Sequence, residues 1–125
     1  MNIPSPPINA ENQPFFDAAR EGRLLLKRCL ACAEVHYYPR ATCPFCASPR
    51  TEWVAAQGRG RIYSFSVMRR AAEPYAIAYV TLEEGVTMLT NLVDCDFDRL
   101  SIGDPVRLVF KRAAGGESIP MFTPT

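Results

Sequence analysis

Apolar residues recur at helical spacing near the start of the chain and at strand spacing after it. Between residues 12 and 22 the apolar side chains fall on one helical face: Phe15, Phe16, Ala18 and Ala19. Asn12 is a suitable cap, Pro14 is tolerated in the first turn, and Gly22 is a natural stop. A helix this short is marginal alone. We therefore expect its phenylalanine pair to dock on the protein's own core or on a partner.

From Leu24 onward the pattern is typical of β-structure. Alternation and β-forming residues predict strands over 24–29, 34–38, 53–57, 61–68, 75–82, 86–93, 106–110 and 117–122. Residues 83–85, Glu-Glu-Gly, predict a hairpin turn, and 94–102 a polar connection with room for one helical turn. No long helix is expected after Trp53.

These strands predict a mainly β protein that ends in a small barrel. An OB-fold fits better than an SH3-like barrel, because the first strand is long and bends near Gly58 and Gly60, and an extra segment separates strands three and four. We expect three parts: a proline-rich arm and short helix over 1–22, a metal-held ribbon over 23–50, and the barrel over 51–125.

Four of the five cysteines form two matched C-x-x-C pairs with ten residues between them: Cys29, Cys32, Cys43 and Cys46. Paired motifs of this kind predict a four-sulfur metal site. Two disulfides are the alternative. Four thiolates close the shell of a zinc ion and leave no position for a reacting water, so the expected zinc is structural. His36, the only histidine, is expected to be a loop residue, and Cys95 a buried structural cysteine.

The chain has no apolar run of membrane-spanning length and no signal-peptide pattern at its start. We therefore expect a cytoplasmic protein without a membrane span. Thiols stay reduced in the cytoplasm, which favours a metal over disulfides.

Charge is unevenly distributed, although the net charge is only +1. Residues 23–70 carry nine basic and two acidic side chains, a balance of +7, and the remainder carries −6. Such asymmetry indicates that the first half meets a polyanion or an acidic surface, or that charged side chains simply solvate a small module.

The succession of motifs resembles a zinc-ribbon/OB-fold family that accompanies thiolases and other acyl-CoA enzymes. The resemblance covers residues 12–110 and is carried by Phe15-Phe16 with Gly22-Arg-Leu, Lys27-Arg-Cys-x-x-Cys32, Tyr38-Pro-Arg40, Cys43-Pro-x-Cys46, residues 58–65 (GRGRIYSF), residues 75–80 (YAIAYV), the 82–86 turn and residues 102–106 (IGDPV). Ala33 departs from the pattern, because many members have glycine there.

The resemblance implies a non-catalytic accessory subunit that binds acyl-CoA or bridges a thiolase-like or acyltransferase-type enzyme to its partner, as a homodimer or hetero-oligomer. Arginine is a preferred donor to the phosphates of coenzyme A. Candidate contacts are Arg40, Arg59, Arg61, Arg69 and Arg70. The phenylalanine helix and the basic ribbon are the expected contact surfaces for the enzyme.

Two other functions fit the same residues. Zinc ribbons and OB-folds also bind nucleic acid, with Tyr63, Phe65 and Tyr79 available to stack on bases, although the near-neutral charge argues against this. A rubredoxin-like iron site would make the protein an electron carrier, because sulfur ligation alone does not separate zinc from iron.

Overall fold

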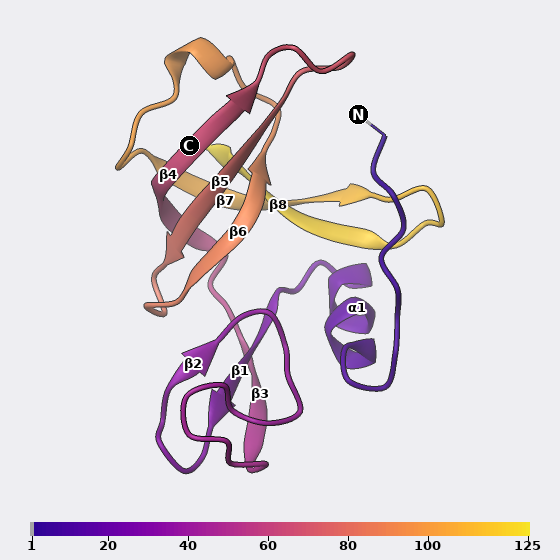
Figure 1. The fold of residues 1–125 in the computed structure, drawn as a ribbon, viewed down its shortest axis with the longest axis vertical. Helices are drawn as coiled ribbons and strands as arrows, with labels where there is room; N and C mark the ends of the chain where they lie inside the picture. Colours follow the sequence, from indigo (N-terminus) through magenta and orange to yellow (C-terminus); the bar gives the residue numbers. More distant parts are fainter. Residues whose placement is uncertain (1) are drawn as a thin grey trace.

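A computed structural model describes residues 2–125 as a small sheet, a barrel and one helix beside them (Figure 1). The mainly β fold predicted from the sequence is confirmed. The elements run from the arm and helix through the ribbon sheet into the barrel.

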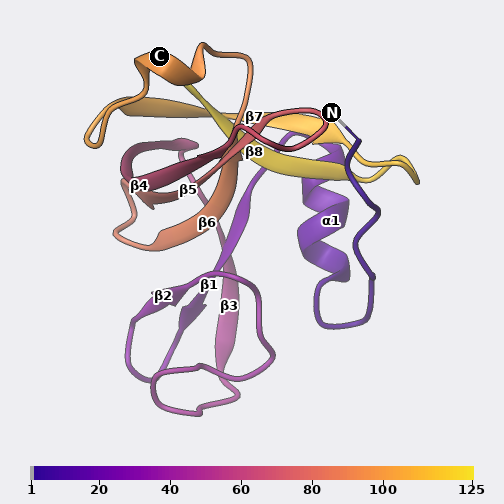
Figure 2. The same ribbon diagram turned by 45° about the horizontal axis from the view of Figure 1, so that its top comes forward.

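The N-terminal arm runs alongside α1 (Gln13–Arg20) in both ribbon views (Figures 1 and 2). The helix starts after Asn12 as predicted, but the Asn12 side chain makes no capping bond to the helix. Its Nδ2 instead donates to the carbonyl of Pro7 and to the hydroxyl of Tyr38. Asn12 therefore ties the arm to the ribbon. Farther along the arm, the amide of Ala114 donates to the carbonyl of Ile3 at 2.9 Å, which attaches the arm to the barrel.

The first sheet has three strands in the order β2-β1-β3. They are β1 (Leu25–Cys29), the short β2 (Val35–His36) and β3 (Thr51–Ala55), and both pairings are antiparallel. The expected domain boundary after residue 50 thus falls just before a strand that pairs with the ribbon and not with the barrel.

The barrel closes through five strands in the order β4-β5-β6-β8-β7. They are β4 (Arg59–Met68), β5 (Tyr75–Leu82), β6 (Thr87–Leu92), β7 (Pro105–Arg112) and β8 (Ser118–Pro124), and η1 (Phe97–Arg99) lies in the connection before β7. Strand β4 is the longest and has an irregular register between Ile62 and Ser64. It pairs with β5 over its length and with β7 at its start. This is the OB-fold expected from the sequence.

Gly60 allows this close pairing. A Cβ added at Gly60 would stand 2.5 Å from the carbonyl oxygen of Thr81 on the neighbouring strand. The glycine is therefore required by the approach of β5, as a glycine within a strand often is.

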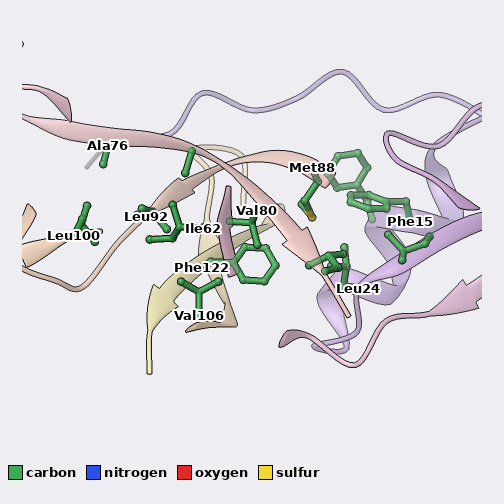
Figure 3. Close-up of a cluster of buried hydrophobic side chains, with 14 residues drawn as sticks. Phe15, Leu24, Ile62, Ala76, Val80, Met88, Leu92, Leu100, Val106 and Phe122 are labelled. Atoms are coloured by element: carbon green, nitrogen blue, oxygen red, sulfur yellow. The ribbon is translucent and has the colours of Figure 1, made fainter. Parts of the chain in front are cut away.

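One hydrophobic core runs through the barrel and reaches the helix (Figure 3). Phe122, Val80 and Ile62 fill the barrel, while Phe15 and Leu24 lie where the helix and the ribbon meet it. Phe15 and Phe16 are 1% and 5% exposed, so the helix docks its aromatic pair inward. Of the two alternatives expected from the sequence, docking of the phenylalanine pair on the protein's own core is confirmed, and these rings supply no contact surface for a partner.

No helix in the described part of the chain is both long and apolar enough to cross a membrane.

Candidate metal centre

The four paired cysteines converge at the end of the ribbon. Their Sγ atoms all lie within 4.8 Å of one another, with 3.6 Å between Cys29 and Cys46 and 3.7 Å between Cys32 and Cys43. A disulfide would bring two sulfurs to about 2.0 Å. At these distances no two of the four cysteines are joined by a disulfide, so all four are free thiols.

The two C-x-x-C turns have matching backbone geometry. The amide of Ala33 donates to the carbonyl of Cys29 at 2.9 Å, and the amide of Ala47 donates to the carbonyl of Cys43 at 2.8 Å. Ala33 and Ala47 both have positive φ angles, 66° and 65°. Each turn thus needs a left-handed residue directly after its second cysteine.

Backbone amides also point at the first sulfur of each turn. The amides of Ala31 and Cys32 donate to Sγ of Cys29 at 3.3 and 3.4 Å, and the amide of Phe45 donates to Sγ of Cys43 at 3.4 Å. The hydrogen bond from the Cys32 amide is the main cause that lowers the pKa of Cys29 to about 6. A thiolate held by such donors is the form that binds a metal.

This cluster fits a tetrahedral ion bound by four sulfurs. Zinc–sulfur bonds of about 2.3 Å place the sulfurs of a regular tetrahedron about 3.8 Å apart. The two cross-turn distances agree with that value. Cys29 and Cys43 are buried whereas Cys32 and Cys46 are exposed, so the cluster lies at the surface with one side open to solvent.

His36 lies on β2 beside the cluster but takes no part in it. Its ring is 3% exposed, and Nε2 accepts a hydrogen bond from the amide of Arg40 at 3.3 Å. Burial, followed by the nearby Lys27, lowers the pKa of His36. His36 is therefore a buried residue that shapes the turn after β2, whereas the sequence predicted a loop position.

Cys95 belongs to the barrel. It follows β6 and packs, partly buried, against the hydrophobic core. Burial, then the neighbouring Asp94 and Asp96, raises the pKa of its thiol. Cys95 is thus half-buried, whereas the sequence predicted a buried position, and its raised pKa favours the protonated thiol.

The five candidate arginines fall in three places. Arg59 and Arg61 are two residues apart on β4 and line one groove of about 480 Å³ with Pro105 and Thr125. Arg40 borders a second groove of about 440 Å³ between the arm, the helix and the ribbon.

Arg69 and Arg70 follow the other end of β4. Arg69 pairs with Asp98 of η1 at 2.8 Å. Of the five candidates, Arg59 and Arg61 are the two that line the same groove.

The contacts that Arg59 and Arg61 make within the protein leave both side chains able to bind a ligand. Arg59 is 3.6 Å from the carboxylate of Glu83, with both side chains more than half exposed, and exposed pairs of this kind are weak. Arg61 donates to the carbonyl of Gly103 at 3.0 Å. Both guanidinium groups thus lie at the groove with donors to spare for an anion.

The aromatic candidates lie on the barrel. Tyr63 and Tyr79 are 67% and 48% exposed, whereas Phe65 is partly buried against the core. The residues of the strands around them, 62–68, 75–82 and 87–92, include no Asp, Glu, Lys or Arg. Within β4, β5 and β6 the only cations are Arg59 and Arg61 at the start of β4, so this face lacks the continuous basic track that single-stranded nucleic acids need.

Two known domain families match the chain, one over the ribbon and one over the barrel. Residues 16–52 match the ChsH2 rubredoxin-like zinc ribbon domain, and residues 53–111 match the ChsH2 C-terminal OB-fold domain. A DUF35 domain-containing scaffold protein of Methanothermobacter thermautotrophicus is 38% identical over 92 residues, which cover 68% of this chain and 69% of that protein. The chain belongs to the DUF35 family.

Longer relatives contain the same unit. A probable enoyl-CoA hydratase alpha subunit of Thermomonospora curvata is 37% identical over 97% of the DUF35 chain, which spans only 40% of the length of that subunit. A solved structure described as an Ltp2-ChsH2(DUF35) aldolase matches with 38% identity and a TM-score of 0.82 over 96% of this chain and 98% of that one. The ribbon-plus-barrel unit therefore occurs both as a short chain and as part of larger proteins.

Two features of the site were not predicted from the sequence. The left-handed Ala47 is one, and the only available signal was its place after the second C-x-x-C, equivalent to Ala33. The buried His36 is another, because a single apolar neighbour on each side does not reveal burial.

Proposed function

We propose that the protein is a non-catalytic, metal-stabilised scaffold subunit of a thiolase-like acyl-CoA enzyme, working in the cytoplasm. One observation carries the proposal: a DUF35 chain seen with an aldolase matches this protein over nearly the whole length of both chains. The names of the longer relatives point to the same class of substrate, since the Thermomonospora protein is described as an enoyl-CoA hydratase subunit.

The described residues support a non-catalytic role. The four thiols that hold a metal leave it no open position for water, and the single histidine is buried with its Nε2 already bonded to a backbone amide. Cys95 has a raised pKa and therefore lacks the thiolate that a nucleophile needs. The function thus rests on binding and positioning.

The experiment that tests the scaffold role is isolation of the native complex. A tagged copy expressed in its own host should co-purify stoichiometrically with an acyl-CoA enzyme identified by mass spectrometry. Recovery of the chain alone, at the abundance of the native protein, would refute the proposal.

Zinc is the metal we assign to Cys29, Cys32, Cys43 and Cys46. When bound, it supplies a structural crosslink between the two turns and no chemistry. Freshly purified protein should hold one zinc per chain and be colourless, whereas a ferric rubredoxin-like centre would be coloured. Cys43→Ser should lower the metal content, because it removes a buried ligand, and Cys95→Ser should leave it unchanged.

Acyl-CoA is the small ligand we assign to the groove beside Arg59 and Arg61. Guanidinium groups bind phosphates through paired hydrogen bonds, and these two side chains project from the same face of β4. The groove is large enough to hold part of a coenzyme A molecule, with Pro105 and Val106 as an apolar wall.

Charge reversal tests the groove. Arg61→Glu should raise the dissociation constant for acetyl-CoA in the native complex, and high salt should weaken binding to the unmodified protein if the contact is exposed. Arg112→Glu is the matched control, because Arg112 lies at the end of β7 outside this groove. Equal effects of both variants would remove Arg61 from the site.

A further inference from the structure

The outer face of β4, β5 and β6 is apolar beyond Arg59 and Arg61, which lie at the start of β4 on the same face as Tyr63. Five of the large exposed hydrophobic residues of the described chain lie on these strands: Tyr75 at the end of β5 that the arm reaches, and the four residues Tyr63, Ile77, Tyr79 and Leu89. Tyr79 and Leu89 are direct cross-strand partners, and Ser64 and Ser66 stand opposite Tyr79 and Ile77 on the other side. We call this surface of β4, β5 and β6, centred on these four residues, the outer patch.

The outer patch is continuous and slightly hollowed. A groove of about 170 Å³ runs between Ser64, Ser66, Ile77, Tyr79 and Leu89. At one edge Thr81 and Thr87 bond to each other through their hydroxyls at 2.9 Å. The patch therefore has an apolar centre and a polar margin, where Arg61 pairs with Thr81 and adds a positive charge. Protein interfaces likewise have an apolar core with charged residues at the rim.

The rest of the molecule does not cover this face. Helix α1 packs on β8 and β1, and the arm reaches only the Tyr75 and Asn91 end of β5 and β6. Figure 1 shows α1 below the barrel and the arm to the right of β6. An exposed leucine and two exposed tyrosines on one sheet face are typical of a surface that binds a partner.

The size of the outer patch argues against a second copy as the occupant. Strands lie about 4.8 Å apart and rise about 3.3 Å per residue, so the face covers roughly 350 Å². Two such faces would bury roughly 700 Å² in total, which is below the roughly 1,200 Å² of a stable interface. A symmetric pair of outer patches is therefore too small to hold two copies together, and a partner that binds here adds contacts outside the patch.

We infer that the outer patch is the anchor for the enzyme subunit, which presents an apolar, uncharged surface to Tyr79 and Leu89. This inference rests on the proposed scaffold function and assigns it a surface. It replaces the phenylalanine helix, which is buried, as the main contact expected from the sequence.

The test uses the native complex and two matched variants. Leu89→Glu places a charge at the centre of the patch, and Ile102→Glu places one on a more exposed apolar residue outside it, before β7. Both variants should keep the thermal unfolding midpoint and zinc content of the parent protein. Leu89→Glu should weaken binding of the co-purified enzyme by about tenfold or more, while Ile102→Glu leaves it unchanged.

Each other outcome overturns the inference. Equal binding by the parent protein and Leu89→Glu would overturn the patch but leave the scaffold function standing. Failure to recover any acyl-CoA enzyme would overturn both. A dimer of this chain that Leu89→Glu disrupts, or binding of a thymidine oligonucleotide that Leu89→Glu abolishes, would assign the patch to another occupant.

Salt provides an independent readout. An interface with an apolar centre should lose little affinity between low and high salt, whereas the acetyl-CoA contact at Arg61 should weaken. A steep salt dependence of enzyme binding would contradict the outer patch and favour the basic ribbon as the anchor.

Discussion

Ala33 and Ala47 each have a backbone conformation that glycine adopts more easily. Both follow the second cysteine of a C-x-x-C turn, and both donate the hydrogen bond that closes it. Left-handed φ angles strain the Cβ of an L-residue. The relative positions of the four sulfurs therefore depend on two slightly strained alanines.

Ala33→Gly and Ala47→Gly should each stabilise the zinc-bound protein by about 1 kcal/mol, since relief of the strain exceeds the added entropy of the unfolded chain. Denaturant unfolding measures this change. Ala31→Gly is the control, because Ala31 lies inside the first turn without a positive φ angle. Equal or negative effects at positions 33 and 47 would show that the turns tolerate alanine without strain.

His36 is the residue whose titration should affect folding. Burial lowers its pKa below the usual value of 6.5, so the folded protein favours the neutral ring. The stability that this provides is present above the pKa of the unfolded state and is lost as the pH falls through the folded-state pKa. Lys27, opposite on β1, and Arg40 add positive charge that further disfavours the charged ring.

His36→Gln keeps an acceptor near the Arg40 amide but does not titrate. Unfolding of the parent protein and the variant should therefore differ more in pH dependence below about pH 6.5 than above it. The cysteines, which also bind protons in acid, are common to both proteins and cancel in the comparison. Parallel pH profiles would exclude His36 as the cause.

At the scale of elements, α1 packs against both β8 of the barrel and β1 of the ribbon. Phe16 is 5% exposed and meets Phe15 edge to face, with 5.0 Å between ring centroids. Phe15 in turn stacks at an angle on Tyr38, 5.5 Å away. The helix thus stabilises the junction with its rings and does not offer them to a partner.

Phe16→Ala should cost about 3–5 kcal/mol of unfolding free energy, the usual loss for a buried phenylalanine. Phe45→Ala is the matched control, because Phe45 is 64% exposed, and its change should stay within about 0.5 kcal/mol. Calorimetry on both variants measures the difference. A stable Phe16→Ala protein with weakened enzyme binding would place that ring at the interface after all.

The strands were largely predictable because their alternation depends only on local sequence. The expected strands at 61–68 and 75–82 agree closely with β4 and β5. The partner of β3 was not predictable, since pairing Trp53 with Lys27 is a contact between distant residues. The same holds for the arginines: Arg59 and Arg69 are near in sequence, but the length of β4 separates them.

At the scale of the whole molecule, the parts are linked by few but specific bonds. The Tyr38 hydroxyl accepts from Asn12, the carboxylate of Glu11 accepts from the Ala41 amide, and the Gly115 amide donates to the Ser5 hydroxyl. The arm thus joins the ribbon to the far hairpin of the barrel. These bonds connect the ribbon to the barrel through the arm, which is the connection that the proposed scaffold role needs.

The central claim is that the chain has no activity of its own and supports that of its enzyme. The most direct measurement is acyl-CoA turnover by the co-purified enzyme, by this chain, and by the two recombined. The account predicts no turnover by the isolated chain, reduced turnover by the enzyme alone, and recovery on recombination that Leu89→Glu fails to give. Robust turnover by the isolated chain, or full activity of the enzyme without it, would contradict the account.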